Sequence, residues 1–392
     1  MAPPPIHPPR SRGAPKGRLF LLDQTAERVP IWQKFNNFSF DGAPFAWLSM
    51  NNMGGNVGLQ GALAWVADGV AGALASSGGA LAAVGMDPEG INTMPAYWEY
   101  VLQQAFSPPP PPPAAFLPAY GVQRCGAEGA GTRAAWAALG ATVYAPSQPN
   151  VEHHLHYCGT AMPLPSVGNG WNTPLLRPAF PAAPLAAAWE ALLAAAPRCP
   201  GAAQLYDLVD VGREFLQLFP CVAGHDALLA AASDAAVDGA AAALRGVLGD
   251  LDALLGTTAG FLLGAWLEDA RAVGAAANAS AAELALLQWN ARSQVTTWFP
   301  APPTPDNHLY DYANKLWSGL AKGYYLPRYE LLVARTKEAL RAGRAVNKTA
   351  YAEDLGALGE AWTRGAAAFP AAPVGDALVL SQQLYARYAA GK

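Results

Sequence analysis

The sequence has few charged residues and no region in which charge of one sign collects. Charged side chains make up 14% of the 392 residues, and the formal net charge is −4. Lys and Arg are scattered singly, so the chain has no basic face with which to bind a row of phosphates. The composition therefore argues against a nucleic-acid partner.

Long uninterrupted apolar runs are also missing. The leader MAPPPIHPPRSRGAPKG carries positive charge but lacks the apolar centre of a signal peptide. The most apolar stretch, residues 58–86, is built from Gly, Ala and Ser and is interrupted by Asp68, a costly residue at the centre of a bilayer. We expect no membrane span, and we interpret 58–86 as a helix followed by a buried strand.

Cysteine is scarce, and the four residues form no CxxC pair: Cys125, Cys158, Cys199 and Cys221. This spacing disfavours a zinc site and fits either free buried thiols or one or two disulfides. His153, His154 and His156 precede Cys158 and are metal-ligand types, but neighbours on one loop rarely converge on one ion without a distant ligand. We expect a surface loop there, no metal, and no cofactor.

What the sequence does contain is 52% hydrophobic residues, enough for a large core. Three short apolar runs each end in polar residues: RLFLLD (18–23), PFAWLSMNNMGGN (44–56) and LAAVGMDPEG (81–90). Stretches long enough for a helix lie between them, which is typical of parallel β/α units. A parallel barrel needs eight such units. Either this is a small open sheet, or the front of a barrel is missing.

A proline run at residues 108–113 marks a change of period along the chain. Beyond it, apolar residues recur at i, i+3, i+4 and i+7, which predicts helices. The segments with this period are 206–219, 227–256, 281–298 and 311–325. We therefore expect a disordered proline-rich leader over 1–17, an α/β domain over 18–107 and an all-α domain over 108–392.

Glu89 stands where the third apolar run ends, between Pro88 and Gly90. On its own this fits a turn with a solvated glutamate, because Pro and Gly are common in loops. The alternative is a catalytic acid at the C-terminal end of a barrel strand. Other blocks of the sequence decide between the two interpretations.

Seven blocks, in this order, resemble the α-N-acetylglucosaminidase family, glycoside hydrolase family 89. They are LLDQTAERVPIW (21–32), PFAWLSMNNMGGNVGLQGAL (44–63), VGMDPEGIN (84–92), YDLVDVGRE (206–214), FLLGAWLEDAR (261–271), WNARSQVTTWFP (289–300) and DYANKLWSGLAKGYYLPR (311–328). The resemblance covers most of residues 18–390. It implies an α/β plus all-α chain: the last β/α units of an incomplete (β/α)8 TIM barrel, followed by an all-helical domain.

The resemblance implies an exo-acting retaining hydrolase that removes terminal α-linked N-acetylglucosamine from glycans. Its nucleophile lies in a PEGI motif, which stands here at residues 88–91, so Glu89 is the expected nucleophile. The family's general acid lies in an N-E motif on an earlier strand. The acids of the barrel portion, none of which stands in such a motif, are Asp23, Glu27, Asp41, Asp68 and Asp87. We expect a truncated member that lacks the acid. A non-catalytic sugar-binding remnant and an inactive fragment are the alternatives.

The resemblance also implies substrate contacts from Asn51, Asn52, Trp298 and Tyr312. Asn51 stands where the resembling sequences have His, so it can bond to a sugar hydroxyl but cannot carry a proton. The alternative is that the asparagines cap a tight turn at Gly54. Trp298 and Tyr312 fit either stacking on a sugar or a place in the core.

Three further residues, Asp311, Asn314 and Lys315, are interpreted as a capping cluster at the start of a helix. The expected partner is a glycan with a terminal α-N-acetylglucosamine, and a homo-oligomer is left open. The family implies a lysosomal, vacuolar or secreted protein. Sequons at Asn37, Asn278 and Asn347 agree with a secretory route.

Overall fold

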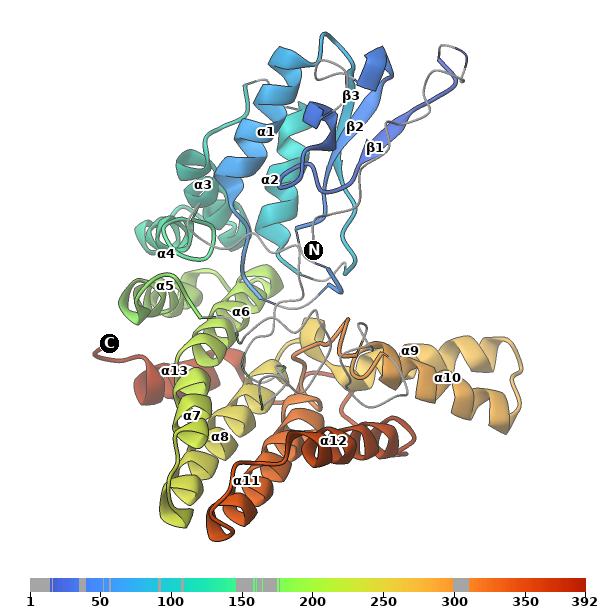
Figure 1. Cartoon of the computed structure of the whole chain (residues 1–392). Helices are drawn as coiled ribbons and strands as arrows, with labels where there is room; N and C mark the ends of the chain where they lie inside the picture. Colours follow the sequence, from blue (N-terminus) through green and yellow to red (C-terminus); the bar gives the residue numbers. More distant parts are fainter. Residues whose placement is uncertain are drawn as a thin grey trace.

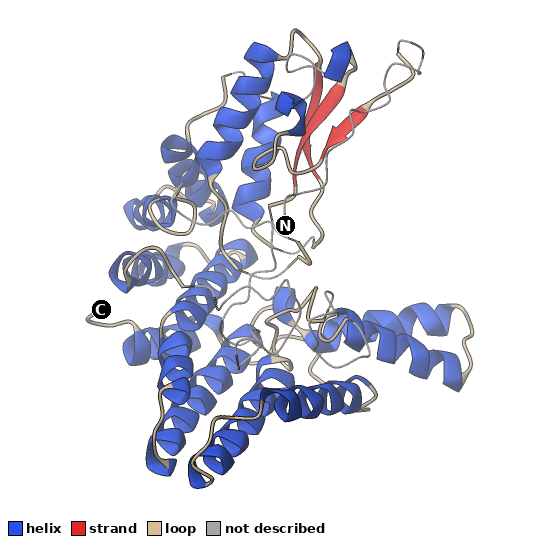
Figure 2. Cartoon of the chain, in the orientation of Figure 1, coloured by secondary structure: helices blue, strands red, loops and turns tan. Residues whose placement is uncertain are grey.

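The structure is a computed structural model that describes residues 15, 17–34, 40–51, 53–55, 58–90, 93–106, 109–145, 158, 160, 164, 175, 177–298 and 310–392. Helices dominate these residues, and a small sheet lies at one end of the molecule (Figures 1 and 2). The leader predicted as disordered, residues 1–17, lies almost entirely outside the described residues.

Three parallel strands form the sheet, in the order β1-β2-β3. They are β1 (Leu21–Asp23), β2 (Phe45–Ser49) and β3 (Leu81–Met86). Phe45 and Trp47 of the central strand lie on the same face of the sheet, and both are fully buried. The three apolar runs of the sequence are thus confirmed as strands, and within the described residues they form an open sheet with β1 and β3 at its edges. The prediction that the last of them is a buried strand is wrong, because β3 lies at an edge and none of its residues is buried.

Two helices follow the strands and pack on the sheet. Helix α1 (Leu63–Ser76) follows β2 and contacts β2 and β3, and α2 (Pro95–Phe106) follows β3 and contacts it. Both helices lie on the same side of the sheet (Figure 1). Gly69 of α1 allows the helix to lie close to the Trp47 ring, because a Cβ at Gly69 would come within 3.0 Å of Trp47 Cζ2. These contacts confirm the predicted β/α units.

The regular elements described beyond the proline run are all helical. They are α3 (Pro113–Cys125), α4 (Ala130–Gly140), α5 (Ala182–Ala195), α6 (Ala202–Leu218), α7 (Pro220–Leu229), α8 (Asp234–Leu255), α9 (Leu263–Ala276), α10 (Ala281–Gln294), α11 (Leu326–Arg341), α12 (Lys348–Thr363) and α13 (Ala377–Tyr388). Two 3-10 segments (Ala196–Arg198 and Ala259–Phe261) and one π-helix (Ala321–Tyr325) also lie there, and two further 3-10 segments (Ile31–Lys34 and Phe40–Gly42) lie before the proline run. The division of the chain at residues 107 and 108 stays a prediction.

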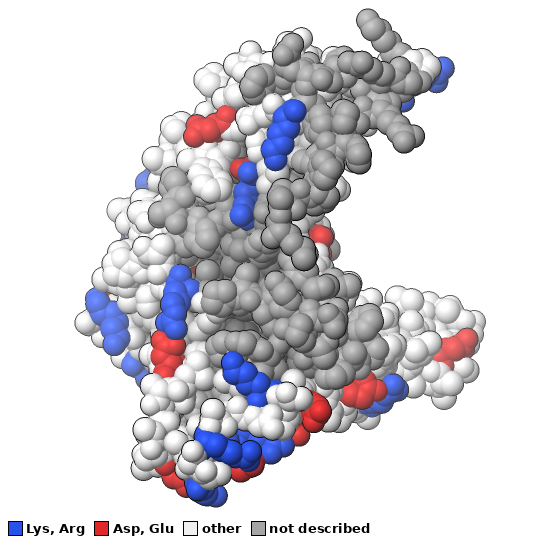
Figure 3. Space-filling model, viewed as in Figure 1, with Lys and Arg blue, Asp and Glu red and all other residues white. Residues whose placement is uncertain are grey.

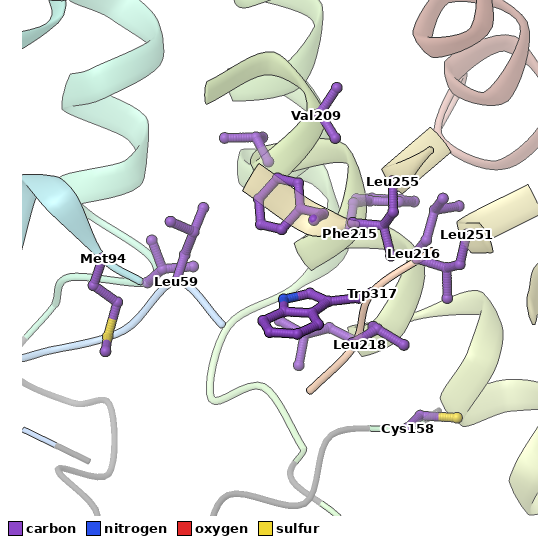
Figure 4. Packing of buried hydrophobic residues seen from close by; sticks show 14 of the residues in the cluster. Leu59, Met94, Cys158, Val209, Phe215, Leu216, Leu218, Leu251, Leu255 and Trp317 are labelled. Carbon is purple, nitrogen blue, oxygen red and sulfur yellow. The ribbon is translucent and has the colours of Figure 1, made fainter. Parts of the chain in front are cut away.

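One continuous hydrophobic core joins the sheet portion to the helices. Leu59 and Met94 come from loops beside the sheet, while Phe215 of α6, Leu251 of α8 and Trp317 come from the helical part, and all five belong to the same buried cluster (Figure 4). Because protein interiors are packed as densely as organic crystals, a shared core holds its parts in a defined relative position. The core therefore fixes the strand ends relative to the helical part.

The segment 311–325 differs from the sequence-based prediction of a helix. Residues 310–320 form turns and a single bridge, in which Ser318 pairs with Leu262, and only Ala321–Tyr325 is helical. Asp311 and Gly319 both have positive φ, at 62° and 92°, which interrupts a right-handed helix. The helical prediction for 311–320 is therefore wrong, because the apolar spacing reflects burial in the core and not a helix face.

All four cysteines form disulfides, which decides between the alternatives left open by the sequence. Cys125 bonds to Cys199, and Cys158 bonds to Cys221. Cys158 is thereby unable to ligate a metal, and the three histidines before it lie outside the described residues. The part of the chain that is described holds no group of three or more metal-ligating side chains, and none of its helices is long and apolar enough to cross a membrane.

Candidate active site

Glu89 lies directly after β3, at the carboxyl end of the sheet, and its side chain is exposed. The N–H of Gly54, which comes from the turn after β2, donates a hydrogen bond to Oε2 of Glu89. The hydroxyl of Tyr312, from the helical part, donates to the same oxygen. Hydrogen bonds to a charged acceptor are shorter and stronger than those between neutral groups. Two donors from separate parts of the chain therefore hold this carboxylate oxygen in place.

Glycine is required where the two turns of the site touch. Gly54 and Gly55 have φ of 72° and 60°, in the left-handed region that side chains rarely adopt. A Cβ on Gly55 would collide with Gly90, and a Cβ on Gly90 would lie 2.7 Å from the Cα of Gly55. A Cβ on Gly54 would collide with the carbonyl of Tyr312. The glycines of the sequence thus allow the turn after β2 to lie directly against Glu89.

Lys315 links the helical part to the same turn. Its Nζ donates to the carbonyl oxygen of Gly54 at 2.7 Å and to that of Gly55 at 2.6 Å. Burial lowers the pKa of Lys315 to about 7, and the nearby Glu89 carboxylate opposes this shift. No helix begins at residues 311–315, so the interpretation of Lys315 as part of a helix cap is wrong. Its amine instead bonds to the backbone of the turn after β2.

Asp311 and Arg328 form a buried ion pair behind Tyr312. Arg328 Nη2 lies 2.7 Å from Asp311 Oδ2, and both side chains are about 2% exposed or less. The Arg328 guanidinium also lies over the Tyr324 ring, 5.4 Å from its centroid. The pair fixes Asp311 in its positive-φ conformation, which directs the next residue, Tyr312, toward Glu89. The sequence indicated Asp311 only as a capping residue and did not indicate Arg328.

Trp298 lies beside Tyr312. Their ring centroids are 5.5 Å apart with an interplanar angle of 46°, and Trp298 is 39% exposed. An exposed aromatic face is able to stack on the apolar face of a sugar ring. The structure therefore brings Glu89, Tyr312 and Trp298 into one site, while the contact with a sugar stays a prediction.

Asn51 is buried and bonds to Glu27, Gln60 and Met94, none of which belongs to the group formed by Glu89, Tyr312 and Trp298. It is 5% exposed, its N–H donates to Glu27 Oε1 at 2.8 Å, and its Nδ2 donates to the carbonyl of Gln60 and to Met94 Sδ. Its φ of 58° agrees with the alternative that it shapes the turn. Contact of Asn51 with a substrate stays a prediction. Asn52 lies outside the described residues.

Glu27 bonds to the backbone where the turn after β2 begins. The sequence indicated it only as an acid that stands in no catalytic motif. Its Oε1 accepts the N–H groups of Met50 and Asn51, at 3.2 and 2.8 Å. Burial raises its pKa to about 7, and the backbone hydrogen bonds oppose that shift. No local signal in the sequence reveals this role, because the bonded partners lie more than twenty residues away.

Asp87 is a second carboxyl group close to Glu89. Burial and, to a smaller extent, the charge of Glu89 together raise the pKa of Asp87 to about 6. Both of its side-chain oxygens are buried and have no hydrogen-bond partner among the residues that the structure describes. Asp87 therefore differs from Glu89, whose carboxylate has two donors.

A carboxylate at the carboxyl end of a parallel strand, with aromatic side chains beside it, is the arrangement of a β/α-barrel active site. Two family models match the chain on either side of the proline run. The one described as Alpha-N-acetylglucosaminidase (NAGLU) tim-barrel domain matches residues 11–108, and the one described as Alpha-N-acetylglucosaminidase (NAGLU) C-terminal domain matches 116–387. The chain belongs to the α-N-acetylglucosaminidase family.

Individual relatives agree with this assignment. Human Alpha-N-acetylglucosaminidase is 31% identical over an alignment of 386 residues, and the match covers 95% of this chain and 49% of that protein. This chain thus spans about half the length of the curated relative it matches. A Family 89 Glycoside Hydrolase from Clostridium perfringens in complex with PUGNAc has a TM-score of 0.82 and 21% identity, covering 96% of this chain and 42% of its own.

A second structure of the Clostridium perfringens protein is a complex with its substrate GlcNAc-alpha-1,4-galactose. It has a TM-score of 0.82 and 22% identity, and it covers 95% of this chain and 42% of its own. At this identity the likeness establishes the fold. The wider fold class predicted from the sequence, a TIM-barrel portion plus a helical domain, is confirmed.

Proposed function

We propose that this chain carries the nucleophile of an exo-acting retaining glycoside hydrolase that removes terminal α-linked N-acetylglucosamine from glycans. The observation that supports it best is the carboxylate of Glu89, exposed at a strand end and hydrogen-bonded by Gly54 and Tyr312. The relatives support the substrate class, since one is named Alpha-N-acetylglucosaminidase and another is described with GlcNAc-alpha-1,4-galactose as its substrate.

In the proposed reaction, Glu89 forms a covalent bond to the anomeric carbon as the glycosidic bond breaks. Both donors bond to Oε2, so we assign Oε1 to the attack. A second carboxylic acid, about 5 Å away in retaining enzymes, protonates the departing oxygen and then takes a proton from the water that releases the sugar. Retention follows because the anomeric carbon is inverted twice.

We assign no residue of this chain as that general acid. Asp87 and Glu27 both have raised pKa values, but Glu27 is buried beneath the turn and bonded to backbone N–H groups. The sequence-based interpretation of a truncated barrel remains our proposal for the origin of the missing acid. It agrees with the open sheet of three described strands, where a complete barrel has eight.

The decisive experiment uses the longest natural polypeptide that contains these residues and an aryl α-N-acetylglucosaminide. Proton NMR of the sugar formed first is expected to show the α-anomer, and Glu89→Ala is expected to remove nearly all turnover. Added azide is expected to restore turnover in Glu89→Ala and to yield a β-azide product, because azide replaces the nucleophile. Release of the β-anomer first would exclude the double displacement.

The exposed face of Trp298 supports a second candidate, a sugar-binding protein without catalysis. In that case N-acetylglucosamine would bind to the protein, and Trp298→Ala would abolish binding, but no aryl glycoside would be cleaved even by the longest polypeptide. Isothermal titration calorimetry beside the turnover assay separates the two candidates. Tyr312→Phe serves as the matched control, because it keeps the aromatic face and removes the hydroxyl that bonds to Glu89.

We also propose that the protein works in an oxidising compartment, either the lysosome or vacuole or outside the cell. Two disulfides that account for all four cysteines support this location, since such bonds persist along the secretory route and are rare in the cytosol. Peptide mapping without reductant is expected to recover the Cys125–Cys199 and Cys158–Cys221 peptides. Free thiols at all four positions in protein isolated from cells would contradict the proposal.

A further inference from the structure

A cavity lies between the α9–α10 hairpin and the end of α12, and it shares no lining residue with the site at Glu89. Its volume is about 670 Å³. Ala282, Ala285 and Leu286 of α10 line it with apolar side chains, and residues 365–367, which follow α12, line it as well. A space of this size is large enough for a small organic molecule.

Three arginines line the cavity: Arg271, Arg292 and Arg364. The lining residues include no Asp or Glu. Arg364 has a partner outside the lining, Glu360, which neutralises its charge. Arg271 and Arg292 lie near each other, and both burial and the charge of Arg271 lower the pKa of Arg292. The cavity thus holds two positive charges without a balancing acid among its lining residues. Elsewhere, on the face drawn in Figure 3, Lys and Arg side chains are scattered, several of them beside Asp or Glu.

Two buried N–H groups at the cavity have no hydrogen-bond partner among the described residues. One is Nε of Arg292, a residue only 3% exposed, and the other is Nε1 of Trp289. Arg292 uses Nη2 to donate to the carbonyl of Ala367, and its guanidinium lies over the Trp362 ring at 5.1 Å. These contacts hold Arg292 in place. A buried donor left unbonded is costly, so both N–H groups favour an acceptor from a bound molecule.

We infer that this cavity binds the oxyanion group of a small molecule, a carboxylate, sulfate or phosphate, whose organic part lies against the apolar side chains of α10. Arg292 Nε and Trp289 Nε1 supply donors from inside, and Arg271 supplies a second charge from the rim. Arginine suits this role because its planar guanidinium matches the oxygens of such groups. The inference is independent of the function proposed for Glu89.

The test uses the full chain and simple anions as probes. Sodium sulfate, sodium phosphate, acetate and benzoate are titrated by calorimetry at constant ionic strength, set with sodium chloride. We expect saturable binding of at least one anion. Arg271→Gln is expected to weaken it by about tenfold, the usual effect of losing one charge-assisted hydrogen bond. Arg344→Gln is the matched control, because Arg344 is an exposed arginine that pairs with Glu338 far from the cavity.

A second measurement reports on the buried donors. The indole N–H signal of Trp289, assigned by its loss in Trp289→Phe, is expected to shift in proportion to anion occupancy. Tighter binding of sulfate or phosphate than of benzoate would identify a dianionic group, and tighter binding of benzoate than of all other probes would identify an organic carboxylate. Binding that does not saturate, equal affinity in Arg271→Gln, or an unmoved Trp289 signal would each overturn the inference.

Discussion

Glu89 takes its two hydrogen bonds from residues on opposite sides of it in the chain. Gly54 lies 35 residues before it and Tyr312 lies 223 residues after it. Lys315, three residues beyond Tyr312, bonds to the carbonyls of the same turn that provides the Gly54 N–H. The negative charge of Glu89 therefore affects the pKa values of two neighbours, Asp87 and Lys315.

Glu89→Gln is expected to lower the pKa of both Asp87 and Lys315. A nearby negative charge raises the pKa of an acid and of an amine alike, and the amide carries no charge. Asp87 starts at about 6 and Lys315 at about 7. Carbon-13 NMR titration of labelled side chains measures both. Glu330→Gln is the control, because that exposed carboxylate pairs with Arg245. A rise in the Lys315 pKa on replacing Glu89 would contradict the geometry of the site.

Two glycines, Gly55 and Gly78, allow the cost of a left-handed backbone to be measured apart from the cost of a steric collision with Gly90. Gly55 and Gly78 share a φ of 60°, but a Cβ on Gly78 meets open space, whereas one on Gly55 meets Gly90. Gly78→Ala is expected to cost about 1–2 kcal/mol of unfolding free energy for the left-handed conformation alone. Gly55→Ala is expected to cost about 1–3 kcal/mol more, as overpacking does. Urea denaturation measures both, and equal losses would mean that the turns do not touch.

At the scale of elements, the segment 310–320 determines how the helical part contributes to the site. It delivers Tyr312 and Lys315 from a stretch without regular structure, pinned by the Asp311–Arg328 pair. Breaking a buried pair leaves an uncompensated charge, which is more costly than removing both partners.

Arg328→Met is expected to lower the free energy of unfolding by about 3–5 kcal/mol. Adding Asp311→Asn should recover most of that loss, since Asn carries no charge and tolerates the positive φ found there. Arg341→Met, which removes an exposed pair with Asp234, should change stability very little. Equal losses in the Arg328 single variant and in the double variant would show that the ion pair does not carry the effect.

The same segment shows what could be predicted from the sequence and what could not. The strands, the helices after them and the position of Glu89 at a strand end depend on local spacing, so they could be predicted. The non-helical course of 311–320 depends on Arg328 and on contacts with residues before α9. The roles of Glu27 and Lys315 likewise depend on partners distant in the chain. Local periodicity contains no information about such partners.

At the scale of the whole molecule, the described sheet ends at β1 and β3, and the described acids include none that we assign as the general acid. The helical part and the sheet nevertheless share one core. The chain is therefore expected to hold Glu89 in a defined place and still to lack part of what the chemistry needs.

Residues 1–392 alone are expected to show negligible hydrolysis of an aryl α-N-acetylglucosaminide, although Glu89 is intact. General acid assistance contributes a factor of about 10² to 10⁴ to the rate. Two substrates test this explanation: a dinitrophenyl leaving group needs little protonation, and a methyl leaving group needs it most. The methyl glycoside should suffer the larger loss relative to a longer family member. Full turnover of both substrates would show that the acid is present within the chain.

The separation of Glu89 from Tyr312 along the chain also matters while the protein is being made. At about 5–20 residues per second, the 223 residues between them take roughly 10 to 45 s to emerge from the ribosome. During that interval the strand ends have been synthesised, but the hydroxyl and the amine that hold them have not. A chain released within that interval therefore contains Glu89 but not the Tyr312 hydroxyl that bonds to it.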